Sequence, residues 1–122
     1  MTRKEIATLF IHETSSGNVE KVFNAHVSLD FIHHNIYFKG DRKSLIDAMI
    51  ESAKTFKDRT VKVFQVIEEK DIVMTHSHIV MVPGQIEVIA IHIFKFVGSK
   101  IVEMWDITQL GPEEVVNENG LF

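Results

Sequence analysis

The sequence predicts an α+β fold in which helices come first and a run of antiparallel strands follows. Two observations carry this prediction. Apolar residues recur with helical spacing behind capping residues in the first half of the chain, whereas β-rich runs divided by short turn sequences fill the second half from Val61. With 122 residues, of which 45% are hydrophobic and 25% charged, the chain is expected to form one globular domain over residues 1–122.

Three helices are expected in the first half. Thr2 and Glu5 have the spacing of a capping box, which predicts a helix as far as about Glu13. Asn18 is the expected N-cap of a second, short helix, and Asp41 is that of a third. The third helix carries a broad apolar face, made of Leu45, Ile46, Met49, Ile50, Ala53 and Phe56.

Five strands are expected, the first over residues 29–35 and the other four as a meander. The meander consists of Val61 to Glu68, Ile72 to Val82, Glu87 to Val97 and Lys100 to Gln109. Gly98-Ser99 separates the last two strands, and its glycine supplies the positive φ that a two-residue hairpin turn needs. From about residue 111 the chain is polar and is expected to form a loose tail.

Several of these strands are apolar on both faces. In the strand before the last turn, one face carries Val88, Ala90, Phe94 and Phe96, and the other carries Ile89, Ile91, Ile93 and Val97. An antiparallel sheet with only one covered face should alternate with polar residues. We therefore expect the second face to be covered as well, most simply by another copy of the chain in a homodimer.

Composition argues against several classes of function. The net charge of −4 and the absence of a basic stripe argue against a nucleic-acid partner. The chain has no cysteine, which excludes disulfides and thiolate chemistry. It has neither an apolar leader nor a membrane-spanning run, so we expect a cytoplasmic protein with no membrane partner. His76 and His78 could offer two imidazoles to a metal, but the further ligands of a cupin-like site are absent, so no metal is expected.

Three motifs resemble the SnoaL-like branch of the nuclear-transport-factor-2-like superfamily, and the likeness runs over nearly the whole chain. Residues 31–36, Phe-Ile-His-His-Asn-Ile, are similar to a Tyr-Ile-Gln-His-Asn-Pro pattern of that branch. Residues 92–95, His-Ile-Phe-Lys, stand where the branch tends to have Asp-x-Phe-Arg. Residues 98–106 are similar to its closing Gly-Lys-Ile-Val-Glu-His-Trp-Asp pattern. The resemblance implies a cone-shaped roll, in which a strongly curved, mostly antiparallel sheet wraps on three N-terminal helices around a pocket.

The resemblance also implies a function. The branch includes polyketide cyclases and has ketosteroid isomerases among its relatives, so the chain is expected to act by acid–base chemistry on a small apolar or aromatic carbonyl compound. Aldol condensation, isomerisation and dehydration all fit, and no cofactor is expected. Gln109 stands where the cyclases carry a catalytic carboxylate. The competing hypothesis is a non-catalytic ligand-binding or dimeric sensing module of the same fold.

The candidate catalytic residues are Asp106, His34 and His92. A carboxylate or imidazole held partly out of water can act as a base at an acidic C–H group, because its pKa moves toward the working pH. Asp106 or His92 is the hypothetical base, and His34 with Asn35 is expected to donate hydrogen bonds to the developing enolate oxygen. The residues expected to bind the substrate are Asn35, Trp105, Gln109 and Phe94.

The register of the last strands decides which of these groups share a face. If both hairpin turns have two residues, Asp106 and His76 both lie opposite Ile91, and Trp105 lies opposite His92. Asp106 and His92 would then occupy different faces of the sheet. A one-residue change in either loop reverses this arrangement. The sequence therefore does not decide which face of the sheet lines the pocket.

Overall fold

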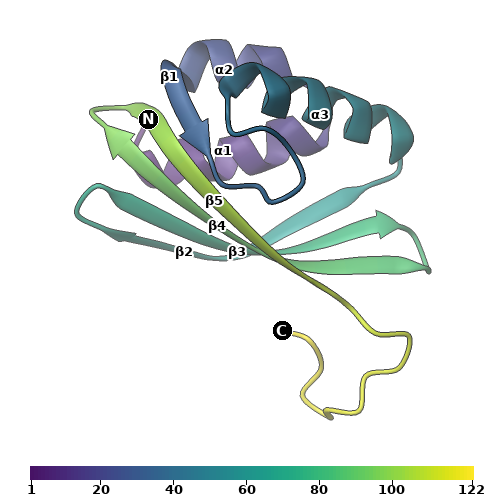
Figure 1. Ribbon diagram of the computed structural model, residues 1–122. Helices are drawn as coiled ribbons and strands as arrows, with labels where there is room; N and C mark the ends of the chain where they lie inside the picture. Colours follow the sequence, from purple (N-terminus) through teal and green to yellow (C-terminus); the bar gives the residue numbers. More distant parts are fainter.

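A computed structural model describes all 122 residues and confirms the α+β fold, with three helices packed on one face of an open five-stranded sheet. Figure 1 shows the helices in the hollow of a strongly curved sheet and the C-terminal segment on its opposite side. The helices are α1 (Arg3–Ser15), α2 (Val19–His26) and α3 (Arg42–Thr55). The strands are β1 (Val27–His33), β2 (Thr60–Glu69), β3 (Ile72–Val82), β4 (Ile86–Val97) and β5 (Lys100–Leu110).

The sheet has the order β1-β5-β4-β3-β2, in which β1 runs parallel to β5 and every other pair is antiparallel. The meander is therefore the one predicted, and β1 closes one edge of it. β1 begins at Val27, two residues before the predicted start, because α2 ends at His26 and Val27 already has an extended backbone.

The predicted capping residues begin the three helices. Thr2 and Glu5 form the full capping box of α1. Asp41 caps α3, since its carboxylate accepts a hydrogen bond from the backbone N–H of Ser44 at 3.0 Å. Asn18 occupies the N-cap of α2 without making a side-chain bond there.

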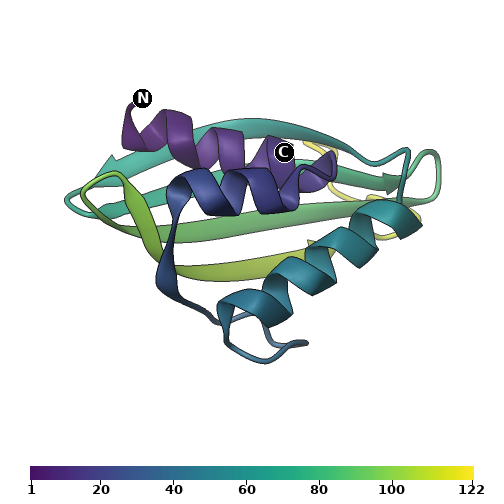
Figure 2. The same ribbon diagram turned by 90° about the horizontal axis from the view of Figure 1, so that it is seen from above.

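The core lies between the helices and the concave face of the sheet. Phe10 of α1 packs against Phe23 of α2 and Phe94 of β4, with ring centroids 5.4 and 5.3 Å apart. Phe31 of β1 meets Phe23 edge-on. Viewed from above, α1 and α2 lie side by side over one part of the sheet, while α3 covers the side near β1 (Figure 2). Leu45 of α3 is buried in the same core.

The last hairpin departs from the predicted register. Gly98 has the expected positive φ of 59°, and Val97 pairs with Lys100 as predicted. Beyond the turn, however, β5 carries one extra residue, Val102, because Phe96 pairs with Ile101 whereas the preceding residue of β4 already pairs with Glu103. This β-bulge shifts all later pairs by one.

The predicted pairing of Asp106 with Ile91 is therefore wrong, since Asp106 lies opposite His92 and Trp105 lies opposite Ile93. The pairing of His76 with Ile91 is confirmed. The physical reason for the shift is burial. Ile101 and Met104 are both fully buried although they are three residues apart, and a regular strand would turn one of them to the outer face.

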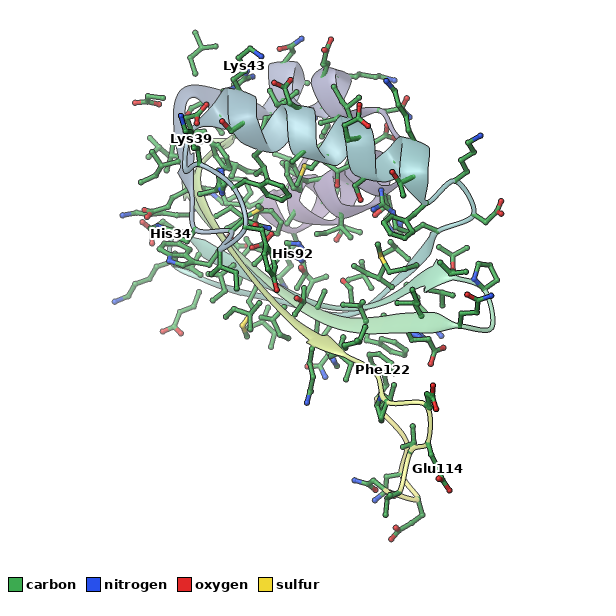
Figure 3. All side chains as sticks on the ribbon, turned by 45° about the vertical axis from the view of Figure 1, so that its right-hand side comes forward. His34, Lys39, Lys43, His92, Glu114 and Phe122 are labelled. Carbon is green, nitrogen blue, oxygen red and sulfur yellow. The ribbon has the colours of Figure 1, made fainter.

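The C-terminal segment after Leu110 lies below the outer, convex face of the sheet (Figure 1). The Phe122 ring stacks on Phe64 of β2 and on His78 of β3, with centroids 4.7 and 4.4 Å apart. Figure 3 shows Phe122 on this side, away from the helices. None of the three helices combines the length and apolar composition that a membrane crossing needs.

Candidate functional site

A row of polar side chains crosses the middle of the concave face. His92 of β4 lies directly opposite Asp106 of β5 on one side and opposite Thr75 of β3 on the other. Side chains paired across strands in this way have Cβ atoms about 4.5–5.5 Å apart. The bulge at Val102 therefore brings an imidazole and a carboxylate together on the face that the helices cover.

Asn35 reaches this row from the segment that follows β1. Its side-chain Nδ2 donates a hydrogen bond to Asp106 Oδ2 at 2.7 Å. The Asn35 side-chain oxygen accepts from the backbone N–H of Tyr37, and the Asn35 backbone N–H donates to His33 Nδ1 at 3.1 Å. Because both ends of the amide are engaged, the side chain of Asn35 holds the Asp106 carboxylate in one orientation.

Burial disfavours the charged form of the His92 imidazole. Only 9% of the residue is exposed, and burial lowers the pKa of the imidazole below its usual value of 6.5, while the Asp106 carboxylate opposes part of that effect. Its Nδ1 is buried and has no hydrogen-bond partner within the chain. A neutral imidazole with an uncommitted ring nitrogen is able to accept a proton.

His34 lies on the other face of the sheet. Its ring stacks on Trp105 at 5.0 Å with an interplanar angle of 9°, and its Nε2 is 2.6 Å from Glu103 Oε2. His33, the last residue of β1, is buried, and Asn35 bonds to Asp106 on the concave face, whereas His34 stacks on Trp105 on the outer face. Figure 3 shows His34 near the sheet edge, whereas His92 lies between the sheet and the helices.

Five of the seven predicted site residues therefore fall into two groups. Asp106, His92 and Asn35 converge on the concave face. His34 and Trp105 form a separate stack on the outer face. Gln109 is exposed near the end of β5, opposite Ile89, and Phe94 is fully buried in the core against Phe10. The roles assigned to these residues from the sequence stay predictions.

A cavity of about 110 Å³ lies between α1, α3 and the sheet, and His92 forms part of its wall. Its apolar lining comes from Ile11, Met49 and Ile79. Its other lining residues are Thr14, Ser15, Ser52 and Arg59. Ligand pockets for drug-sized molecules measure about 300–1,000 Å³, so this cavity fits a small compound.

Several polar residues of this region were missed in the sequence. Arg59 stands in a charged connection, Lys57-Asp58-Arg59, which is typical of an exposed loop. Thr75 and Ser77 are fully buried in β3, and neither hydroxyl has a partner within the chain. Thr75 and Ser77 alternate with His76 and His78 along β3, and this pattern could have indicated a polar site. Two hydroxyl groups on a buried strand face cost free energy unless each has a hydrogen-bond partner.

Metal-ligating side chains do not gather at this site or elsewhere in the chain in groups of three or more. His78 Nε2 lies 3.2 Å from Glu87 Oε1, and both His76 and His78 pack on the Phe122 ring.

Comparison with family models and with curated proteins finds no match to this sequence. Solved structures do match it. IdmH from Streptomyces antibioticus, a proposed polyketide cyclase, is 16% identical over 88% of this chain and 92% of its own, with a TM-score of 0.71. A proposed SnoaL-like polyketide cyclase from Jannaschia is 19% identical over 87% of this chain and 84% of its own, with a TM-score of 0.72.

A third match is an NTF2-like protein of unknown function from Cytophaga hutchinsonii, with a TM-score of 0.70 and 15% identity over 89% of this chain and 91% of its own. The fold is that of the SnoaL-like, nuclear-transport-factor-2-like proteins. The resemblance predicted from the motifs is thus confirmed at the level of fold. Identities this low carry no chemistry across, because one fold supports many unrelated functions.

Proposed function

We propose that the protein is a small-molecule enzyme that moves a proton at a carbon atom next to a carbonyl group, with His92 and Asp106 as its acid–base pair. The observation that carries this proposal is a buried imidazole that lines a cavity and lies directly opposite a carboxylate held by Asn35, with its pKa lowered by burial. Titratable groups perturbed by burial and by a charged neighbour are typical of catalytic sites.

In the proposed step, a ring nitrogen of His92 takes the proton from the carbon acid. The electron pair of the broken C–H bond moves toward the carbonyl oxygen, which becomes an enolate. Asp106 stabilises the imidazolium that forms, and Asn35 keeps the carboxylate in place. The hydroxyls of Ser15 and Ser52 line the same cavity and are candidate donors to the enolate oxygen.

The fate of the enolate decides the overall reaction. Return of the proton from His92 to another atom of the substrate gives isomerisation. Attack of the enolate carbon on a second carbonyl gives an alkoxide, which takes the proton back from His92 to form the aldol product. Loss of a hydroxyl group from the neighbouring carbon gives dehydration, and the same proton lets the group leave as water. All three share the same first proton transfer, so that transfer is the step to measure.

The test is deuterium exchange in D₂O, followed by proton NMR, with small methyl ketones and short oxo acids as probes. We expect the unmodified protein to accelerate exchange at the carbon next to the carbonyl. Asp106→Asn and His92→Gln should each lower that rate by about a hundredfold or more, because general acid–base catalysis contributes that much. His12→Gln, on the exposed side of α1, is the matched control and should leave exchange unchanged.

Two results would overturn this proposal. Exchange that depends on His34 but not on His92 would move the chemistry to the outer face. Binding of the probes without any exchange would favour the alternative, a ligand-binding module of the same fold.

A further inference from the structure

Arg59 is a cation without a counter-ion at the cavity. It lies in the short connection between α3 and β2 (Figure 1). Its Nη1 donates to Ser52 Oγ at 2.8 Å, and its Nη2 donates to the backbone carbonyl oxygens of Ser15 at 3.0 Å and Thr14 at 3.5 Å. All three acceptors are neutral. No carboxylate lies within 4.0 Å of the guanidinium, and none lines the cavity.

The surroundings of Arg59 make this arrangement costly. The side chain is half-buried, and desolvation lowers the pKa of its guanidinium, although an arginine of this kind remains charged. The Nε atom is buried and has no acceptor. A cation taken out of water is stabilised by a negative partner, and a donor left unpaired adds a further desolvation cost.

The other two arginines are placed differently. Arg3 lies over the Phe96 ring and donates to the carbonyl oxygens of Gly98 and Lys70 at the tips of two hairpins. Arg42 lies over the Phe23 ring in an outer groove that Glu20 and Asp47 also line. Arg59 alone among the three shares a cavity with His92.

We propose that Arg59 anchors the carboxylate of a small oxo acid whose carbonyl group lies at His92. The anion supplies the missing counter-charge and an acceptor for Nε–H, while Ile11, Met49 and Ile79 pack against the carbon chain between the two polar ends. The position of the carbonyl group at His92 rests on the proposed function. The carboxylate site does not, because it is inferred from the contacts of Arg59 alone.

The experiment compares acids with their neutral analogues. Pyruvate, acetoacetate and levulinate are titrated into the full-length protein, each beside its methyl ester, while the arginine Nε–H signals are followed by ¹⁵N–¹H NMR. We expect the acids to bind and to shift the Arg59 signal, and the esters to bind at least about tenfold more weakly, because a charge-assisted hydrogen bond is lost. Arg59→Met should lower the affinity for the acids to that for the esters, and Arg59→Lys should retain part of it.

Arg3→Met is the matched control, and it should leave acid binding unchanged because Arg3 lies away from the cavity. If Arg59→Met fails to fold, the acid–ester comparison on the unmodified protein and the Arg59→Lys variant decide the outcome. Esters that bind as tightly as acids, acid binding unaffected by Arg59→Met, or no acid binding up to about 10 mM would each overturn the inference.

Deuterium exchange separates this inference from the proposed function. Acids that bind through Arg59 and show no exchange would leave the anion site standing and refute the acid–base proposal. Exchange that depends on His92 and Asp106 but is unaffected by Arg59→Met would leave the acid–base proposal standing and refute the anion site.

Discussion

The imidazole of His92 links the chemistry of the site to the stability of the protein. Burial favours its neutral form, and Asp106 is the one carboxylate that opposes this effect. Arg59 lines the same cavity and adds positive charge to it. The protonated form of His92 is therefore disfavoured by burial and stabilised by Asp106. An acid–base pair needs these two effects to be in balance, so that the imidazole can both take up and release a proton.

This balance predicts a pH dependence of folding. The unfolded chain protonates His92 with its ordinary pKa of 6.5, whereas the folded protein protonates it only at lower pH. The unfolded state then binds more protons below that value, so the free energy of unfolding should fall as the pH drops through and below 6.5. Urea unfolding between pH 5 and 8 measures this. His92→Gln should flatten the slope, whereas His12→Gln should not, and equal slopes in all three proteins would contradict the account.

At the scale of the element, the bulge in β5 decides what the site contains. Val102 is the extra residue. At the same point in the sheet, the backbone N–H of Phe96 donates a hydrogen bond to the carbonyl oxygen of Asp71 at 2.8 Å. Downstream of the bulge, Met104 and Asp106 share the concave face. A regular β5 of the same length would turn Asp106 outward.

A matched pair of length changes tests this role. Deletion of Val102 removes the bulge but keeps every later pair, so the protein should still catalyse deuterium exchange. Insertion of one alanine between Met104 and Trp105 should move Asp106 to the outer face and lower the exchange rate by about a hundredfold, as loss of the acid–base pair would. Circular dichroism checks that both variants fold, and exchange retained by a folded insertion variant would show that Asp106 is dispensable.

The packing of α1 on the sheet is the second element-scale feature that the site needs, since the cavity lies partly beneath this helix. Phe10 is fully buried between Phe23 and Phe94. Phe10→Ala should lower the free energy of unfolding by about 3–5 kcal/mol in urea titrations, because it leaves a cavity in the core. Leu29→Ala, at a side chain that is 89% exposed, should change it by less than about 0.5 kcal/mol. Similar losses in both variants would refute this account of the core.

At the scale of the whole molecule, no helix covers the convex face of the sheet (Figure 1). The helices cover the concave face, whereas the C-terminal segment lies below the convex one (Figure 1). Ile67 and Ile107 remain 51% and 58% exposed there, and Trp105 is only partly covered by His34. Contiguous apolar surface of this kind is typical of a protein–protein interface.

The homodimer through this face stays a prediction, and sedimentation at micromolar concentration tests it. The unmodified protein should sediment at twice the chain mass of 14.0 kDa. Ile107→Lys should shift it to the monomer, because a charge would be buried in the interface. Leu29→Lys, on the edge strand, should remain dimeric. An unmodified protein that sediments as a monomer contradicts the prediction.

The sequence alone determined the order and type of the elements. The Thr2–Glu5 box, the Asp41 cap and the Gly98 turn are local signals, which depend on a few neighbouring residues, and all three are present in the structure. The motif resemblance also predicted the correct fold, because each motif is a pattern of residue types among near neighbours in the chain. It also gave Asp106, His92 and Asn35 as candidate site residues, and their roles stay predictions.

Only the tertiary structure decided which of these residues meet. The burial of Ile101 and Met104 on one face requires an extra residue in β5, and this requirement depends on the packing of the helices rather than on the local sequence. The chain that follows β1 places His34 and Asn35 on opposite faces of the sheet, although the two are neighbours in the motif. Arg59 reaches the cavity through contacts with α1 and α3, which are distant in sequence. Site geometry depends on such long-range contacts, because a shift of one residue changes the face on which every later side chain lies.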